Sequence, residues 1–383
     1  MAGAAAPGRV MAADAIIRGD LVFALANASD DADVRRMLRE NALGGRIALT
    51  LEREPNAFSA DFGLAAAHAV IIARDRASGV AIGLCERVVR RAYIDGAVQA
   101  LPYLGALRVA PSHRHRIGVL RGGFEALELL ARRPVDLPFA LTSITADNAL
   151  AKRLLTRGLP RLPHYHPVGA FSTFALRSRR NAVASTIAAA TAADLPDIAA
   201  FLQRQNARFQ FAQVWSATGL RALAAADLEP GHFLVARRAG EIRGCLAVWD
   251  QRAFRQAVVR RYPPWMQRLR PLLNAVAPFA GTVSLPAVGE PIAQAVLSHL
   301  AVADDDRQVF LDLVAAGLDQ AARRGLGAAS IGFATERGLR GALLQRYRAI
   351  EYRTSLYLVH WPEAAASVSQ MRAGLPHPEL GLL

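Results

Sequence analysis

The chain has 383 residues, of which 52% are hydrophobic and 20% are charged. Because single domains usually hold about 100–200 residues, this length predicts two domains with sizeable cores and excludes global disorder. The 46 basic and 32 acidic side chains give a formal net charge of +14, which favours anionic ligands such as phosphorylated cofactors. The sequence has no compact basic run with interleaved aromatic residues, and this argues against nucleic acid as a partner.

The two cysteines, Cys85 and Cys245, lie far apart and have neither a metal-ligand spacing nor a disulfide pattern. We therefore expect no metal and a cytoplasmic protein, since free cysteines are typical of a reducing compartment. Residues 271–289 form the longest uncharged stretch, but three prolines break it too often for a lipid-spanning helix, so no membrane partner is expected. We interpret residues 1–20 as a flexible leader without the apolar core of a secretory signal.

The first part of the chain, residues 21–178, predicts an antiparallel meander followed by alternating strands and helices. Alternating apolar patterns, capping residues and helical spacings predict these elements in order: strand 23–29, helix 31–42, strand 67–74, strand 80–94, a hairpin turn at Asp95-Gly96, a returning strand to Val109, helix 117–131, strand 138–145, a helix capped by Asn148, and strand 170–176.

A similar order restarts after a polar, basic connector at residues 179–185 and continues over residues 186–361. Its predicted elements include a hairpin turning at Ala239-Gly240, a strand at 294–303 and a helix at 309–324. This recurrence indicates a divergent internal duplication, followed by a tail at 362–383. We predict an α/β (α+β) fold of two tandem domains, each a mostly antiparallel mixed sheet flanked by helices.

The strand that ends at Val109 runs through a basic turn into a helix. Arg114, His115 and Arg116 surround the start of this helix, where unpaired N–H groups and the helix dipole favour an anion. Two glycines in the helix, Gly122 and Gly123, cost it on the order of 2 kcal/mol against alanine, so we expect something to approach its first turns closely. An ordinary strand–helix junction with solvated arginines is the alternative.

This region resembles the GNAT superfamily of N-acetyltransferases, and the repeated order resembles its tandem-domain members. The resemblance rests on two patterns, V-x-P-x-x-R-x-x-G-x-G/A and N-x-x-A-x-x-L-x-x-x-G, represented here by Val109, Pro111 and Arg114, and by Asn148, Ala151, Leu154 and Gly158. It implies that residues 21–178 bind acetyl-CoA as a co-substrate and that residues 186–361 form a degenerate GNAT-like domain.

The resemblance also implies where the coenzyme binds. The strand backbone would pair with the pantetheine arm, and the loop amides would hold the pyrophosphate. The implied coenzyme-binding residues are Leu107, Val109, Arg114, His115, Arg116, Ile117, Gly118, Val119 and Asn148. Two positions depart from the family. Its loop glycines fall on Ile117 and Val119, and Leu155 replaces a tyrosine that many relatives use as a general acid.

Acyl transfer to an amine needs a neutral amine, a polarised thioester carbonyl and a proton for the leaving thiolate. Tyr165, His166 and Glu86 are our candidate catalytic residues. Tyr165 and His166 follow the second helix and come nearest in sequence to the expected thiol, whereas Glu86 lies on a strand. A packed, hydrogen-bonded turn explains the first two residues as an alternative.

The second domain lacks this anion-binding chemistry, because residues 304–306 are three aspartates that would repel a pyrophosphate. We expect this domain to be a structural partner or a wall of the acceptor site. The sequence therefore predicts an acetyl-CoA-dependent N-acetyltransferase that acts on a small-molecule or peptide amine, with a homodimer left open. The alternatives are a catalytically weak acyl-CoA-binding regulatory protein and a tRNA-dependent aminoacyl transferase of the same fold.

Overall fold

The computed structural model describes residues 10–12, 15–42, 47–59, 64–133, 135–280 and 282–383. The strands of the first half are β1 (Val10–Ala12), β2 (Ala15–Arg18), β3 (Leu21–Leu25), β4 (Ala48–Glu52), β5 (Ala67–Asp75), β6 (Ala81–Ile94), β7 (Ala97–Val109), β8 (Phe139–Thr145) and β9 (His164–Arg177). Its α-helices are α1 (Asp31–Glu40), α2 (Ile117–Ala126) and α3 (Ala149–Leu155). A π-helical turn at Leu127–Ala131 prolongs α2.

The strands of the second half are β10 (Ile187–Ala189), β11 (Phe233–Arg238), β12 (Glu241–Trp249), β13 (Gln256–Arg261), β14 (Gln294–Val302), β15 (Ala328–Ala334) and β16 (Ile350–His360). Its helices are α4 (Leu195–Asn206), α5 (Ala217–Ala222), α6 (Pro264–Ala280), α7 (Arg307–Arg323), α8 (Leu339–Arg346) and α9 (Ala365–Ser369). In the described residues no helix is both long enough and apolar enough to cross a membrane.

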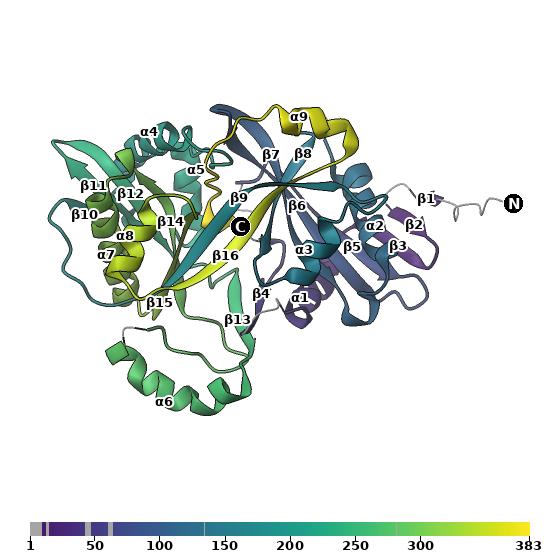
Figure 1. Cartoon of the computed structure of the whole chain (residues 1–383), viewed down its shortest axis with the longest axis horizontal. Helices are drawn as coiled ribbons and strands as arrows, with labels where there is room; N and C mark the ends of the chain where they lie inside the picture. The colour runs from purple at the N-terminus through teal and green to yellow at the C-terminus, as the bar shows by residue number, and fades with distance from the viewer. Residues whose placement is uncertain (1–9, 13–14, 43–46, 60–63, 134, 281) are drawn as a thin grey trace, which may run out of the picture.

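One mixed sheet of 14 strands runs through both halves in the order β1-β2-β3-β5-β6-β7-β8-β16-β9-β15-β14-β12-β11-β10. Helices cover both faces of this sheet (Figure 1), and β4 pairs separately with β13. The predicted α/β class, with a mostly antiparallel mixed sheet flanked by helices, is confirmed. The predicted hairpin turn at Asp95-Gly96 is also confirmed, because β6 pairs with β7 as far as the partners Ile94 and Ala97 on either side of the turn.

Two long strands are exchanged between the halves. β9 comes from the first half and pairs with β15 of the second, while β16 comes from the second half and pairs with β8 of the first. β9 and β16 also pair with each other, and Figure 1 shows them crossing the centre of the molecule side by side. Each half therefore completes its sheet with a strand from the other, an arrangement that local sequence patterns do not reveal. The division into domains at 21–178 and 186–361 stays a prediction.

Both ends of the chain contribute more structure than we expected. Within the predicted leader, β2 pairs with β3 and Ile16 is fully buried, whereas residues 1–9 and 13–14 lie outside the described residues. The predicted tail contains α9 and a 3₁₀ turn at Leu380–Leu382. Its last residues pack against the sheet at the centre of the molecule (Figure 1). These short segments lack helical or alternating periodicity, so their structure depends on contacts with distant strands.

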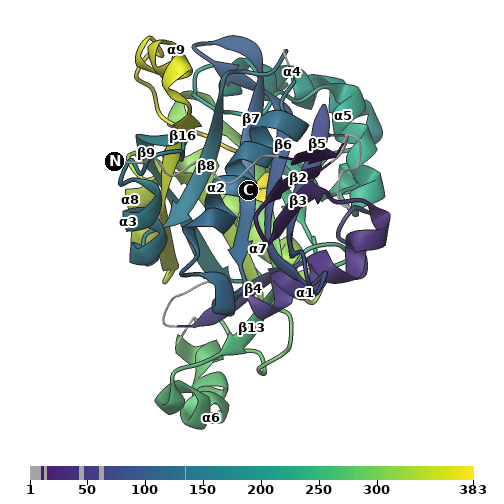
Figure 2. The same cartoon turned by 90° about the vertical axis from the view of Figure 1, so that its right-hand side faces the viewer.

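Helices α1 and α2 cover opposite faces of the first half of the sheet. The side chains of β6 alternate between them: Leu84 packs with Met37 of α1, and the next residue, Cys85, packs with Phe124 of α2. In contrast, α6 projects beyond the sheet in both views (Figures 1 and 2), and Phe279 near its end is 91% exposed. One face of β6 is therefore covered by α1 and the other by α2, so side chains on the two faces of this strand have different neighbours.

The adjacent glycines Gly122 and Gly123 of α2 face different neighbours. A Cβ added at Gly122 would overlap the buried ring of Phe23 on β3, while one added at Gly123 would meet only Cys85 Sγ, at 3.9 Å. The close approach that we expected at these turns is therefore made, at Gly122, by a packed phenylalanine.

We expect Gly122→Ala to lower the free energy of unfolding by about 1–3 kcal/mol, because the added methyl group overpacks the core. Gly123→Ala is the matched control and should raise this free energy by up to about 1 kcal/mol, through helix propensity alone. Urea unfolding followed by circular dichroism measures both values. Equal effects of the two substitutions would contradict this packing role for Gly122.

Candidate functional site

Strands β7 and β8 diverge soon after they meet. They run parallel but pair only at Tyr103–Leu141 and Leu104–Thr142. Just beyond, Ala106 has a φ of +49°, and the register between β6 and β7 shifts near Glu86. This bulge bends β7 away from its neighbour. From Gly105 to Val109, no strand of the described chain pairs with the β8-facing edge of β7.

A cavity of about 460 Å³ lies in this splay. β7 contributes Leu104–Arg108 to its wall, β8 contributes Thr142–Thr145, and Asn148 and Tyr165 also line it. The second half supplies part of the wall through Gln251 and Arg255, together with other residues. Because the sheet is continuous, the cavity has walls from both halves.

The turn between β7 and α2 leaves backbone amides available to a ligand. In this part of the described chain, the amides of His115, Ile117 and Gly118 are not bonded to other backbone groups. The arginine side chains of the turn are already engaged: Arg114 donates to the Val109 carbonyl and to Asn41, each at 3.2 Å, and Arg116 pairs with Asp20 at 2.6 Å. The amides and the helix dipole are therefore the free anion-binding elements of the turn.

The glycine of this turn, Gly118, lies one residue away from the positions of the family's glycines, and it leaves the mouth of the turn open. Val119 is buried beneath α2, and Ile117 packs at the edge of the same apolar cluster, so both side chains point into the core. Gly118 is exposed, and a Cβ added there would have only Leu21 nearby, at 4.0 Å. The two departures from the family glycines therefore place no side chain over the free amides.

Asn148 has a structural role as well as a place in the cavity wall. Its side chain accepts a hydrogen bond from the Ala151 amide at 3.0 Å and caps α3. This is the capping that the sequence predicted. The cap fixes the start of α3 beside the splay.

Glu86 is buried on the α1 side of the sheet. It forms an ion pair with Arg53, and His68 Nε2 lies 2.6 Å from its other oxygen. Burial opposes its ionisation, but the charge of Arg53 and the hydrogen bonds from His68 and Arg53 hold the pKa of Glu86 well below its usual range. The Glu86 side chain is thus an ionised carboxylate bound to both Arg53 and His68.

Two tyrosines line the cavity as protonated phenols. Burial raises the pKa of Tyr103, whose hydroxyl lies 2.8 Å from that of Ser143. Burial and the neighbouring Cys85 raise the pKa of Tyr165, whose ring packs edge-on against Tyr357. His166 is exposed and lies outside the described lining of the cavity. The structure thus brings Tyr165 and Glu86 to one cavity and leaves His166 on the surface.

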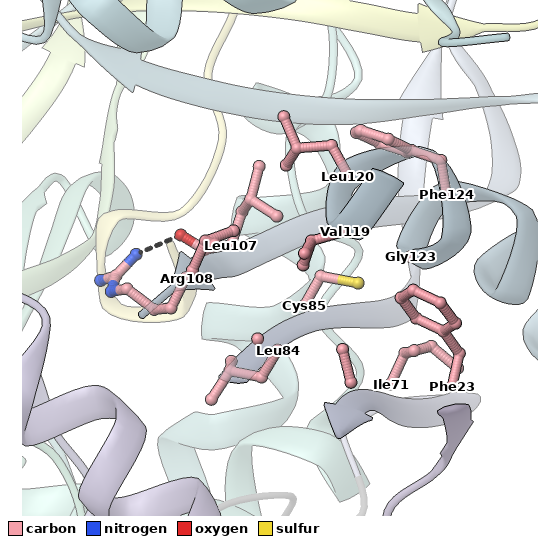
Figure 3. Close-up of a pocket in the computed structure, with 13 residues that line it drawn as sticks. Phe23, Ile71, Leu84, Cys85, Leu107, Arg108, Val119, Leu120, Gly123 and Phe124 are labelled. Carbon is pink, nitrogen blue, oxygen red and sulfur yellow. Dashed lines mark hydrogen bonds between the residues drawn. The ribbon is translucent and has the colours of Figure 1, made fainter. Parts of the chain in front are cut away.

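Sequence reasoning missed Arg108 and Arg255, which also line the cavity. The signal for Arg108 was the alternation of β7, because a residue between Leu107 and Val109 must point to the opposite face. Figure 3 shows this arrangement: Arg108 extends away from Leu120 and Phe124 of α2, and its guanidinium reaches only the Leu107 carbonyl. Arg255 lies in a loop of the other half and had no local signal.

The second half has a similar splay, but the chain itself fills it. β14 and β15 pair in parallel only as far as Leu297 and Ile331. Beyond that point, His377 Nε2 lies 3.0 Å from the Leu300 carbonyl, and Glu379 accepts a hydrogen bond from the His299 amide at 2.9 Å.

The three aspartates after β14 are also occupied. Asp304 pairs with Arg243, Asp305 pairs with Arg337, and Asp306 caps α7. The gap and the turn that correspond to the first cavity are therefore used within the fold by the chain's own residues.

Comparisons with known proteins establish the fold. No protein-family model matches the sequence, and no curated protein matches it. Among solved structures, N-myristoyltransferase from Saccharomyces cerevisiae with bound myristoyl-CoA is similar, with a TM-score of 0.59 and 10% identity over 90% of this chain and 83% of that one. A GCN5-related N-acetyltransferase from Sphaerobacter thermophilus has a TM-score of 0.54 and 14% identity over 89% and 96% of the two chains.

A third similar structure is the GCN5-related glucosamine N-acetyltransferase region of a fungal multi-domain GH3 β-N-acetylglucosaminidase. Its TM-score is 0.56 at 14% identity, and the match covers 90% of this chain and 38% of that one. The chain therefore has the fold shared by GCN5-related N-acetyltransferases and N-myristoyltransferase. At the level of fold, the resemblance seen in the sequence is confirmed.

We expect Glu86→Gln to lower the free energy of unfolding by about 3–5 kcal/mol, because it leaves the buried Arg53 without its counter-charge. The matched control is Glu128→Gln, which removes an exposed i,i+4 pair with Arg132 and should change this free energy by less than about 1 kcal/mol. Urea unfolding at pH 7 measures both variants. A similar small effect at the two positions would contradict a structural role for the Glu86 carboxylate.

Proposed function

We propose that the chain is an acyl-CoA-dependent N-acyltransferase, with acetyl-CoA as its co-substrate, and that the cavity in the β7–β8 splay is its active site. One observation carries this proposal: the unpaired edge of β7 leads from the free amides at the start of α2 into a cavity of about 460 Å³. The fold supports it, since the similar structures are named as N-acetyl- and N-myristoyltransferases.

In this proposal the first half holds the coenzyme. The backbone of Leu107 and Val109 pairs with the pantetheine arm along the free edge of β7. The amides of His115, Ile117 and Gly118, together with the dipole of α2, hold the pyrophosphate. The arginines of the turn supply positive charge from the positions where Asp20 and Asn41 fix them. Asn148 lines the inner end of the cavity.

The acceptor reacts as a neutral amine. Its nitrogen attacks the thioester carbonyl carbon, the C–S bond breaks, and an amide and coenzyme A form. The amine gives up one proton, and the sulfur gains one. Tyr165 is our candidate proton donor to the sulfur, because it lines the cavity and its raised pKa keeps it protonated. Glu86 holds Arg53 in place on the acceptor side and is too well stabilised as a carboxylate to exchange protons readily.

The coenzyme site is tested by a charge placed at the start of α2. Gly118→Asp adds a carboxylate beside the proposed pyrophosphate site, where the protein itself leaves room and where an acidic residue favours the helix. We expect the Kd for acetyl-CoA to rise at least about tenfold in calorimetric titration, with no loss of thermal stability.

The matched control is Gln308→Asp, at the corresponding position of α7 in the second half, which should leave acetyl-CoA binding unchanged. Tight binding to the Gly118→Asp variant would exclude the pyrophosphate from this turn. Absence of acetyl-CoA binding to the wild type would contradict the proposed function as a whole.

The proton donor is tested by Tyr165→Phe. We expect kcat for coenzyme A release to fall by about 10²-fold, the usual effect of losing a general acid, while the Kd for acetyl-CoA stays the same. Tyr352→Phe, at a tyrosine outside the described lining of the cavity, is the matched control and should keep full activity. Wild-type turnover by the Tyr165 variant would assign the proton transfer to another group.

A further inference from the structure

The acceptor side of the cavity carries an excess of positive charge. The charged side chains in its described lining are Arg53, Arg90, Arg108, Arg252, Arg255, Glu52 and Glu86. The two carboxylates are engaged, since Glu86 pairs with Arg53, and Glu52 pairs with Arg260 outside this set. Arg252 is matched by Asp250 at 2.8 Å. Neither Arg108 nor Arg255 has a side-chain carboxylate partner among the described residues.

Arg108 is the most unusual of these side chains. Its Nη1 donates to the carbonyl of the preceding residue, Leu107, at 3.0 Å, and its Nε is inaccessible to solvent without a hydrogen-bond partner in the described residues. Burial and the neighbouring charge of Arg53 lower the pKa of Arg108 to about 10. A cation removed from water without a counter-ion is unfavourable, so the fold maintains Arg108 at a cost to its own stability.

Arg255 adds to the positive potential from the second half. It donates to the main-chain oxygens of Gly381 and Leu383, at 3.3 and 2.8 Å. Burial, followed by the charge of Arg53, lowers its pKa to about 10. Arg255 thus already has oxygen partners in the last residues of the chain, and the half-buried Arg108 is the guanidinium of this wall that remains to attract an anion.

We propose that the acceptor amine carries a carboxylate or phosphate group, and that this group binds the two Nη atoms of Arg108 on the α1 side of the cavity. This inference rests on the proposed function and specifies its acceptor. A guanidinium presents two parallel N–H donors, which match the oxygens of a carboxylate or a phosphate. The coenzyme phosphates have their own site at α2, on the face of β7 opposite to the Arg108 side chain (Figure 3).

The position of Arg108 also suits an acceptor. It lies between Leu107 and Val109, the residues proposed to hold the pantetheine arm, so an anion at Arg108 lies beside this arm, in the same cavity. An acceptor anchored there has its amine held within the same cavity. The competing explanation is that Arg108 serves only the fold, by bonding to the Leu107 carbonyl at the bulge of β7.

The experiment compares two matched pairs of amines. β-Alanine and β-alaninamide differ in a carboxylate, and O-phosphoethanolamine and ethanolamine differ in a phosphate. Each is titrated by calorimetry into the wild-type protein, both alone and saturated with coenzyme A, and each is assayed for coenzyme A release from acetyl-CoA. We expect at least one anionic amine to bind about tenfold or more tightly than its neutral partner, since hydrogen bonds to charged groups contribute about 1.5–3 kcal/mol. The pair with the larger ratio identifies carboxylate or phosphate.

Arg108→Gln should abolish this preference while leaving the Kd for acetyl-CoA unchanged. Arg108→Lys keeps the charge but not the pair of donors, and should retain part of the preference. Arg243→Gln is the matched control, because Arg243 pairs with Asp304 in the second half, and it should behave as the wild type. Since Arg108 is an unpaired cation, its replacement by glutamine should not lower the melting temperature.

Equal binding of the charged and neutral members of both pairs, or a preference that survives in Arg108→Gln, would overturn the proposal in favour of the purely structural role. A lowered melting temperature in both Arg108 variants, without loss of preference, would also overturn it. Failure of the proposed function has a different signature, which is a wild type that does not bind acetyl-CoA. The titrations without coenzyme A still measure anion recognition in that case.

Discussion

The structure depends on an interruption of backbone hydrogen bonding in the centre of its sheet. Parallel strands normally pair along their length, because an unpaired buried N–H or carbonyl group is unfavourable. β7 and β8 pair at only two positions and then separate at a bulge marked by the positive φ of Ala106. The cavity, the free edge of β7 and the inward position of Arg108 all follow from this separation. A second molecule that pairs with the edge would satisfy the groups that the sheet leaves open.

The exchange of β9 and β16 determines how the two halves share this site. Because each strand completes the sheet of the other half, the halves cannot separate without breaking hydrogen bonds along two strands. Residues from the second half therefore form a fixed wall of the cavity in the first. The second splay, between β14 and β15, is closed by His377 and Glu379. The sheet is thus interrupted twice. The gap in the first half is a cavity, and the gap in the second half is filled by the chain's own residues.

Charge distinguishes the two faces of the site. On the α1 face, Glu86 neutralises Arg53 through a buried ion pair, and His68 binds the same carboxylate. Burial and the neighbouring charge of Arg53 lower the pKa of Arg108, which has no carboxylate partner in the described part of the chain. On the α2 face, the cavity lining includes the apolar side chains of Leu107, Phe124 and Leu127, and the positive end of the helix dipole lies at the mouth of the splay. The cavity therefore offers one side to an apolar or neutral chain and the other to an anion.

Local sequence by itself determined the elements whose signals lie within a few residues. The hairpin at Asp95-Gly96 follows from turn chemistry, the start of α3 follows from the cap at Asn148, and the apolar spacing after Ile117 predicts a helix on one face of the sheet. The same kind of local signal predicts an anion-binding site at the turn before α2. Only the tertiary structure decided that β9 and β16 change places, that the chain's last residues fill the second splay, and that Arg108 lies half-buried without a carboxylate partner among the described residues. The exchanged strands pair with segments more than a hundred residues away, and the residues that fill the second splay contact a strand 77 and 80 residues away, so no local pattern specifies these contacts.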